Sequence, residues 1–323
     1  MIKLKDLIVE DHHDKKEGKM AKYDAKEIAD DAMDVFKMIE KEDDLPEVFQ
    51  NYDFIWLRLG FKISKDLLCN PKRKIAAIIC PATGLDHIDL KTCKELGIKV
   101  LSLKGENEFL KEIRATAELT IGLTLSILRK IPNAVLSVKN KEWNRDSFKG
   151  SEVFNKNIGI VGMGRLGKIV ADYFIALGAN VSGYDIKKFK INGVKNTESI
   201  KELVSISDII SIHIDYNESN HHLFDKNLFS HFKEKSILIN TSRGGIVDSN
   251  ALIYSLKSKR LSGAALDVIE DEFNFPKSSL IKYAQNNDNI IITPHIGGNT
   301  KESFNKTEIF LAKKLSKLAN INV

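Results

Sequence analysis

The feature that most restricts the fold is a glycine-rich turn between a predicted strand and a predicted helix. The sequence IGIVGMGRLG places Gly162, Gly164 and Gly167 directly after an apolar run. At such a turn the first glycine permits a tight bend, the second lets a pyrophosphate approach the backbone, and the third lets the helix pack closely on the strand. The phosphates would lie over the N–H groups of Arg165 and Leu166, at the positive end of the helix. The pattern therefore predicts a dinucleotide-binding βαβ unit.

A carboxylate at the end of the next predicted strand indicates which dinucleotide would bind. Asp185 follows residues 180–184 and could accept hydrogen bonds from the adenosine ribose hydroxyls, whereas it would repel a 2′-phosphate. This predicts NAD rather than NADP as the cofactor, although Lys187 and Lys188 nearby carry the opposite charge. A helix cap or turn carboxylate is the alternative interpretation of Asp185.

The rest of the chain also alternates strand and helix patterns, which favours parallel sheets. A chain of 323 residues is long enough for two domains. A long apolar helix is predicted over 115–131, ending at Pro132, and an exposed loop over 144–150. The other predicted helices are 25–40, one after Asp86, 166–177 and 301–318, and the predicted strands are 54–59, 75–80, 99–103, 158–161, 180–184, 209–214, 236–240, 262–266 and 290–293.

Three passages place polar residues just past the ends of predicted strands, where open α/β sheets bind their ligands. They are SILINTSRGGIVD with Arg243, GAALDVIEDE with Asp267, Glu270 and Glu272, and IITPHIGG with His295. A histidine titrates near neutral pH and can act as an acid or a base. An arginine offers a planar fork that matches a carboxylate. These passages predict a site for an anionic substrate and a proton transfer.

Composition gives no basis for several other functions. The net charge of +5 comes from 49 basic and 44 acidic residues without a basic stripe, so no nucleic-acid partner is expected. No apolar run reaches the roughly 18 residues of a membrane span. Three cysteines without CxxC spacing are typical of reduced thiols in the cytoplasm. The pairs His12–His13 and His221–His222 lie in polar surroundings, so a surface location is expected and no metal is predicted.

The glycine turn and the three passages, together with ATGLDHIDL at 82–90 and ATAELTIGLTLSILRKIP at 115–132, resemble the D-2-hydroxyacid dehydrogenase family over nearly the whole chain. The resemblance implies an NAD-dependent oxidoreductase that interconverts a 2-keto acid and a D-2-hydroxy acid. It also implies two Rossmann-like or flavodoxin-like domains with a cofactor cleft between them. Residues 1–114, completed by 299–323, would form the substrate domain, and 115–298 the NAD-binding domain.

The resemblance also assigns catalytic roles. His295 would be the general acid and base, Glu272 would hold its imidazole, and Arg243 would bind the substrate carboxylate and polarise the carbonyl. Each has an alternative: Arg243 could pair with a phosphate or a carboxylate, and His295 could cap the turn that follows it. The family usually has a proline after the glutamate, whereas Phe273 stands here, so Glu270 is a rival for Glu272.

Other contacts are implied by the same resemblance. The backbone of Thr83 and Gly84 would bind the substrate carboxylate as an anion-binding nest. Arg58 would meet a distal group of the substrate, or alternatively form a surface ion pair. The remaining cofactor contacts would be His213, Thr241, Ser242, Asp267 and Gly297.

The resemblance leaves the substrate, the assembly and one insertion open. A homodimer is expected through the helix 115–131 and the arm 132–150. The alternatives are a short form of 3-phosphoglycerate dehydrogenase, a non-catalytic relative that senses NAD, and a different Rossmann enzyme. The stretch Lys104–Arg114 is longer than the family's usual link, and could shape a pocket or hinge or be a surface elaboration.

Overall fold

The computed structural model describes residues 44–57, 60–270 and 272–318. Contacts divide the chain into a small unit, which comprises the residues up to Leu110 and those from Lys301 on, and a large unit, Lys111–Thr300. The units therefore change at Leu110 and Thr300, whereas the sequence suggested 114 and 298. The predicted helix 25–40 and Arg58 lie outside the described residues.

The small unit is built on a parallel sheet of three strands in the order β1-β2-β3. The strands are β1 Phe54–Trp56, β2 Ala77–Cys80 and β3 Lys99–Ser102, and the helices are α2 Leu45–Asn51, α3 Lys65–Leu68, α4 Leu90–Glu95, α5 Asn107–Leu110 and α13 Lys301–Leu318. β1 and β2 are buried along their whole length. Strands covered on both faces read as continuous apolar runs, which is why they could be predicted.

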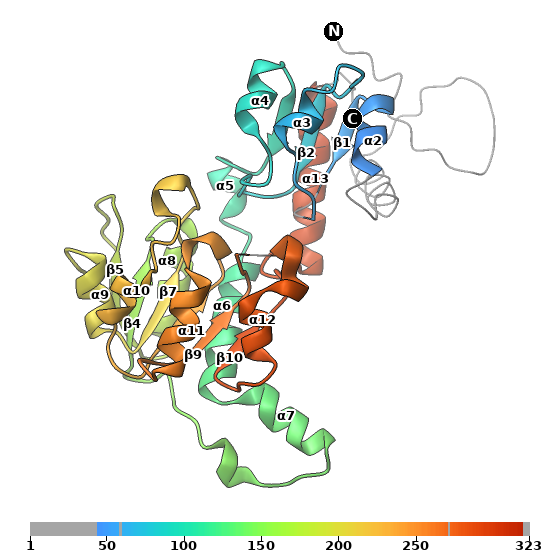
Figure 1. The fold of residues 1–323 in the computed structure, drawn as a ribbon. Coiled ribbons are helices and arrows are strands. Elements are labelled where there is room, and N and C mark those ends of the chain that lie inside the picture. The colour runs from blue at the N-terminus through green and yellow to red at the C-terminus, as the bar shows by residue number, and fades with distance from the viewer. Residues whose placement is uncertain (1–43, 58–59, 271, 319–323) are drawn as a thin grey trace. The chain divides into compact units, whose positions relative to one another are not determined.

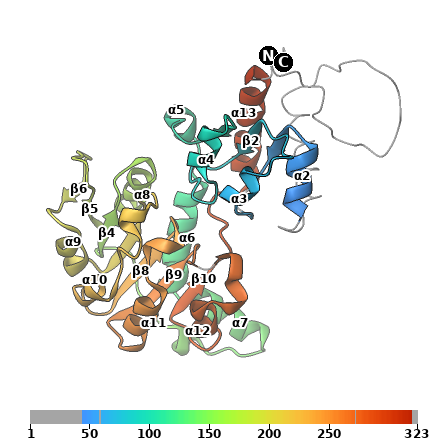
Figure 2. The same ribbon diagram turned by 45° about the horizontal axis from the view of Figure 1, so that its top comes forward.

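The C-terminal helix α13 belongs to this small unit, where it lies beside the sheet (Figures 1 and 2). Phe310 of α13 stacks on Phe109 of α5, with ring centroids 4.1 Å apart. Lys314 donates to the Ser102 carbonyl at 3.2 Å and pairs with Glu106 at 2.6 Å. The insertion 104–114 thus supplies two of the contacts that hold α13.

The large unit is a parallel sheet of seven strands in the order β10-β9-β8-β7-β4-β5-β6. Its strands are β4 Asn157–Val161, β5 Asn180–Tyr184, β6 Val194–Asn196, β7 Ile209–Ile212, β8 Ser236–Asn240, β9 Leu261–Leu266 and β10 Ile290–Ile292. Its helices are α6 Ala115–Leu128, α7 Ile131–Lys139, α8 Arg165–Ala176, α9 Ile200–Ile206, α10 Lys226–Ser230, α11 Ser249–Lys257 and α12 Ser279–Ala284, with 3-10 turns η2 Arg145–Phe148, η3 Glu218–Asn220, η4 Gly244–Ile246 and η5 Glu272–Lys277.

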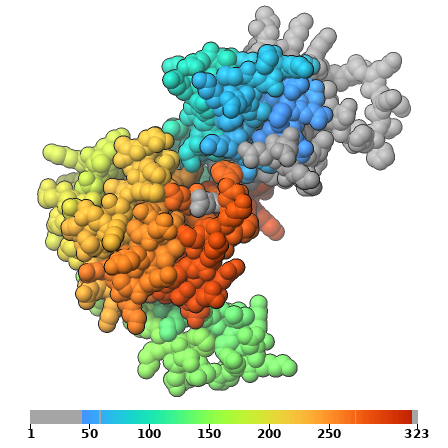
Figure 3. Space-filling view, in the orientation of Figure 1, coloured from blue at the N-terminus to red at the C-terminus, as the bar shows by residue number. Residues whose placement is uncertain are grey.

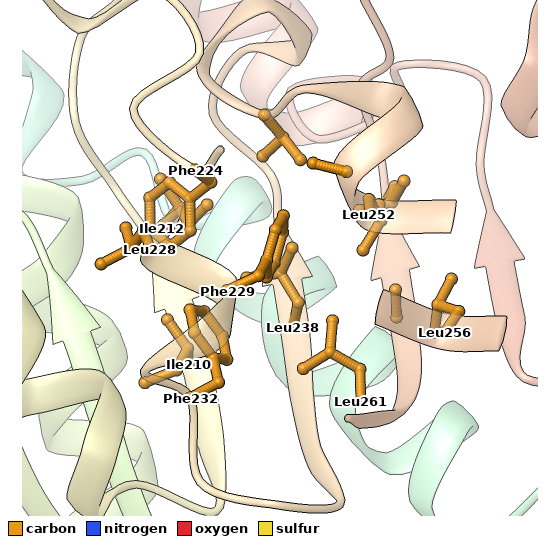
Figure 4. Packing of buried hydrophobic residues seen from close by; sticks show 14 of the residues in the cluster. Ile210, Ile212, Phe224, Leu228, Phe229, Phe232, Leu238, Leu252, Leu256 and Leu261 are labelled. Atoms are coloured by element: carbon orange, nitrogen blue, oxygen red, sulfur yellow. The ribbon is translucent and has the colours of Figure 1, made fainter. Parts of the chain in front are cut away.

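Two apolar clusters pack this sheet. One joins side chains of α6 and α8 to the sheet. The other joins α9, α10, α11 and α12 to it, and Figure 4 shows part of it, including Phe224, Phe229 and Phe232, whose ring centroids lie 5.1–6.3 Å apart. Burying such side chains stabilises the fold by roughly 1.5–3 kcal/mol each. The sheet is therefore a fixed platform for the loops at its strand ends.

One sequence expectation was wrong in this unit, and one strand was missed. The predicted helix does not continue to Ile131; α6 ends at Leu128, Lys130 adopts a left-handed conformation with φ 52°, and Pro132 lies in the first turn of a new helix, α7. A proline is well tolerated there because its missing N–H has no partner in the first turn. The strand β6 was not predicted. Its residues are half-buried or exposed, so they lack an apolar pattern.

Among the described helices, no single one has the length and apolar character needed to cross a membrane, although the bent pair Asn107–Leu128 and Ile131–Lys139 passes that test jointly.

Candidate active site

The glycine turn joins β4 to α8 in the way that the sequence predicts. Gly162 has φ 94°, and a Cβ at this position would collide with the His213 carbonyl. A Cβ on Gly167 would collide with the Gly162 carbonyl, so this glycine lets α8 approach the strand. A Cβ on Gly164 would meet nothing within 4 Å. The turn therefore exposes its backbone at Gly164, where α8 begins, and this suits a phosphate.

The side chains of Arg165 and Asp185, beside this turn, form hydrogen bonds with backbone groups. The Arg165 guanidinium donates to the Ile113 carbonyl at 2.9 Å, and burial, with a contribution from Arg114, lowers its pKa. Leu166 is half-buried in the first turn of α8. One oxygen of Asp185 accepts the Met163 N–H at 2.7 Å and the other accepts the Lys187 N–H at 2.9 Å. Asp185 is thus a turn carboxylate whose remaining lone pairs could still accept ribose hydroxyls.

A buried polar atom beside this turn also fits a cofactor. His213 lies just past β7, and its Nε2 contacts the Ser211 hydroxyl at 2.8 Å. Its Nδ1 is buried without a hydrogen-bond partner in the described structure. Burial lowers the pKa of His213 to about 3, so the imidazole is neutral at physiological pH. Buried polar atoms normally have a partner, which makes Nδ1 a candidate contact for a bound group.

Thr241 and Ser242 follow β8 and are fixed by neighbouring polar groups. The Thr241 hydroxyl contacts the Thr120 hydroxyl of α6 at 2.9 Å. Asn240 accepts the backbone N–H and the hydroxyl of Ser242, at 3.0 and 2.8 Å, and donates to the Arg243 carbonyl at 3.0 Å. Asn240 and Thr120 were missed by the sequence reasoning, although a buried asparagine at a strand end is a signal for such a role.

The histidine and the carboxylate predicted to transfer a proton do meet. His295 Nδ1 lies 2.7 Å from Glu272 Oε2, and the other oxygen of Glu272 accepts the Ile269 N–H at 3.3 Å. Their side chains are 22% and 32% exposed, so the pair is accessible but not fully solvated. If Nδ1 carries the proton shared with Glu272, the other ring nitrogen is the one that exchanges a proton with a ligand.

Asp267 holds the loop that carries His295. Its Oδ1 accepts the Thr293 hydroxyl at 2.6 Å and the Ile296 N–H at 2.9 Å, and its Oδ2 accepts the Gly297 N–H at 2.7 Å. Its carbonyl accepts the His295 N–H at 2.9 Å. Burial raises the pKa of Asp267, while these hydrogen bonds act in the opposite direction. His295 itself has φ 52°, a left-handed conformation that this network holds in place.

The structure separates the two rival glutamates. Glu270 contacts His222, with Oε1 2.6 Å from Nε2, and lies 3.4 Å from the Ser249 hydroxyl. Glu272, not Glu270, is therefore the carboxylate in contact with His295. Arg243 precedes η4, and its guanidinium donates to the Ser242 carbonyl at 2.8 Å.

The remaining candidates belong to the small unit. Thr83 is exposed and Gly84 half-buried in the loop that follows β2. Their expected contact with a substrate stays a prediction. The candidate residues of the large unit all follow the carboxyl ends of its strands or begin α8.

Comparisons with known proteins agree with this geometry. Residues 121–297 match the family model of the D-isomer specific 2-hydroxyacid dehydrogenase, NAD binding domain. The chain is 31% identical to hydroxypyruvate reductase of Thermotoga maritima, over 86% of this chain and 88% of that protein. It is 33% identical to D-3-phosphoglycerate dehydrogenase of Methanocaldococcus jannaschii over 86% of its own length, but spans only 52% of that relative. The structure resembles D-lactate dehydrogenase from Aquifex aeolicus complexed with NAD and lactic acid, with a TM-score of 0.75, 29% identity and 85% of each chain covered.

The chain belongs to the D-isomer specific 2-hydroxyacid dehydrogenase family. This confirms the predicted family, the α/β fold with parallel sheets, the NAD-dependent oxidoreductase class and NAD as the cofactor. A small hydroxy or keto acid as substrate fits the same family.

Proposed function

We propose that this chain transfers a hydride between NAD(H) and a 2-keto acid/D-2-hydroxy acid pair, with His295 as the acid and base. The observation that carries the proposal is the 2.7 Å contact between His295 and Glu272. Reduction of a keto acid needs a hydride donor, a proton donor and a cation for the carboxylate. Bound NADH supplies the hydride.

The side chains of the large unit supply the other two requirements. In the reductive direction the charged imidazole of His295 gives its proton to the oxygen of the forming hydroxyl, and Glu272 stabilises the imidazolium beforehand. In the oxidative direction the neutral imidazole accepts that proton. Arg243 binds the substrate carboxylate through its planar fork and polarises the carbonyl. Thr83 and Gly84, in the loop after β2 of the small unit, have backbone N–H groups that would suit a substrate carboxylate.

The cofactor contacts follow the same assignment. The pyrophosphate would lie at Gly164 and the first turn of α8, where the backbone is open. Asp185 would accept the ribose hydroxyls and disfavour a 2′-phosphate. Thr241 and Ser242 would lie on the ribose side, Gly297 and Asp267 near the nicotinamide, and His213 Nδ1 would find its partner in the bound cofactor.

A reductase assay tests this function directly. NADH oxidation would be followed with glyoxylate, hydroxypyruvate, pyruvate, branched 2-keto acids and 3-phosphohydroxypyruvate. We expect turnover of at least one of them, the D-hydroxy acid as product, and a preference for NADH over NADPH. NADH binding without turnover of any keto acid would instead show a protein that senses the cofactor, and turnover that requires NADPH would overturn the role of Asp185.

We further propose that two copies of the chain pair through α7 and the segment after it, which project from the sheet of the large unit (Figures 1 and 3). Leu136 is 58% and Trp143 89% exposed, and Ile131, Val135 and Val138 are exposed beside them. Several exposed apolar side chains on one short segment suit an interface between two copies of the chain. Light scattering tests this: the parent chain should be a dimer and the Val135→Glu/Leu136→Glu double variant a monomer. A monomeric parent chain would refute the proposal.

We place the protein in the cytoplasm, in accord with Cys69, Cys80 and Cys93, which are all thiols. We propose no nucleic-acid or membrane partner.

A further inference from the structure

A second cluster of ligand-type side chains lies outside the proposed active site. His221, His222 and Glu270 each offer one nitrogen or oxygen ligand atom, and these atoms all lie within 4.8 Å of one another. His221 and His222 follow η3, whereas Glu270 follows β9, so the cluster joins two separate loops. The sequence alone places His221 and His222 on the surface, but the fold brings the carboxylate to them.

The geometry points to a binding site for a divalent transition metal ion such as Zn²⁺, held by His221, His222 and Glu270. We infer this site independently of the dehydrogenase function. Two neutral imidazoles and one carboxylate form the nitrogen and oxygen donor set that proteins use for zinc, and they leave a fourth position for water. The set carries one negative charge, which a dication compensates.

The spacing of the donors is close to what an ion requires. The His222–Glu270 pair is 2.6 Å apart, and the rings of His221 and His222 stack with centroids 3.8 Å apart. A zinc ion with bonds of about 2.0–2.2 Å needs its ligand atoms roughly 3.3–3.6 Å apart, so the His222 and Glu270 atoms would separate by roughly 1 Å to admit it. The side chains of His222 and Glu270 are 35% and 28% exposed, which leaves the cluster open to an ion from solvent.

Neighbouring groups fix the ligands. The Tyr216 hydroxyl lies 3.2 Å from His221 Nδ1, and a bond at that nitrogen would leave Nε2 as the metal ligand. The His222 N–H donates to the Gly245 carbonyl at 2.9 Å, which fixes the backbone of this residue at φ 52°. The backbone of Ile269 and Glu270 packs directly against Gly244. A Cβ on Gly244 would collide with the Ile269 carbonyl and the Glu270 nitrogen.

These contacts give the ion a structural consequence. Gly244 and Gly245 follow Arg243, and they lie between the loop with His222 and the loop with Glu270. An ion that joins His222 to Glu270 would therefore clamp the three loops that follow β7, β8 and β9. A ligand that binds only the folded state raises stability by mass action, so the melting temperature should rise with the concentration of Zn²⁺.

Isothermal titration calorimetry of the full chain with ZnCl₂ tests the site, after bound metal has been stripped with a chelator and the chelator removed. We expect one saturable equivalent in the parent chain, and affinity at least about tenfold weaker in His221→Gln, in His222→Asn and in Glu270→Gln. Asparagine is chosen at His222 because it tolerates the left-handed backbone, and His221 is exposed, so its replacement should fold.

Matched controls remove other histidines. His231→Gln changes an exposed histidine outside the cluster, and His12→Gln with His13→Gln changes the other adjacent pair. Both controls should bind Zn²⁺ as the parent chain does and show the same rise in melting temperature. The absence of saturable binding, binding retained by the His221→Gln/His222→Asn double variant, or binding lost in the His12/His13 control would each overturn the assignment.

Discussion

The large unit contains two histidine–glutamate pairs that look alike when only the contact is measured. His295 lies 2.7 Å from Glu272 and His222 lies 2.6 Å from Glu270, and both histidines have φ 52°. The two glutamates come from the same loop after β9, yet they reach different histidines. Contact distance alone therefore does not distinguish a proton-transfer pair from a pair of metal ligands.

The supports of the two histidines differ. The loop of His295 is tied to the buried Asp267, whose two oxygens accept the next two backbone N–H groups along the chain. His222 is held by one backbone bond to Gly245, and its ring stacks on the exposed His221. A rigid loop with a single imidazole suits proton transfer, where position decides the rate. An accessible pair of imidazoles suits coordination of an ion.

The largest expected effect comes from replacing the two histidines in the same way. His295→Asn should lower kcat by roughly 10²–10⁴-fold, because a positioned general acid contributes that much. Asparagine again tolerates the left-handed backbone, so the loss reports on the imidazole rather than on the fold. His222→Asn, assayed with a chelator present, should lose much less. Steady-state kinetics on the best keto acid measures both.

Two further measurements complete that comparison. NADH binding, followed by fluorescence, should survive in His295→Asn, and His231→Gln should keep the parent kcat. Near-normal turnover by His295→Asn, or an equal loss of kcat in both histidine variants, would contradict the assignment of proton transfer to His295 and not to His222.

Replacing the two glutamates should have a smaller effect on kcat, and Glu272→Gln should again lower it more than Glu270→Gln. Glu272→Gln keeps the shape of the side chain but removes the charge that orients and stabilises the imidazolium, so kcat should fall by roughly 10–100-fold. Its kcat should also follow a different pH profile from that of the parent chain. In Glu270→Gln the imidazole of His295 keeps its partner, so the pH profile should retain the parent shape. Parent-like profiles in both variants would argue against Glu272 as the positioning carboxylate.

The sequence predicted the parts of the structure that depend on local patterns. The bounds of β5, β8 and α13 agree with the ranges predicted from the sequence, and the glycine turn follows from the positions of three glycines. The family resemblance supplied the roles of Arg243, Glu272 and His295. The choice between Glu272 and Glu270 depends on which histidine each meets across the fold, and a departure at Phe273 had left it open.

Contacts between distant segments were the part that the sequence could not predict. The insertion 104–114 had no assigned role, and the structure shows Phe109 stacked on Phe310 far along the chain. The His221–His222–Glu270 cluster arises in the same way, because it joins the loops that follow β7 and β9, two strands separated in the sheet by β8. The network around Asp267 likewise joins β9 to the loop after β10.

His213, the third histidine that follows a strand of this sheet, extends the comparison, because its imidazole contacts the Ser211 hydroxyl instead of a carboxylate. Burial lowers its pKa to about 3, whereas an unfolded histidine titrates near 6.5. Below the unfolded value the unfolded chain binds a proton that the folded chain does not, so stability falls as the pH decreases through this window. The loss between pH 7.5 and pH 5.5 should be about 1.4 kcal/mol from this residue.

His213→Gln isolates that contribution because glutamine does not titrate. Chemical denaturation at the two pH values measures the free energy of unfolding. Between pH 7.5 and pH 5.5 this free energy should fall by about 1.4 kcal/mol more in the parent chain than in His213→Gln, whatever the stability of the variant at each pH. In variants at His295 the free energy of unfolding should still fall between the two pH values by the contribution of His213. An equal fall in the parent chain and in His213→Gln would mean that the buried imidazole accepts a proton in the folded state, and the neutral ring proposed beside the cofactor would then be wrong.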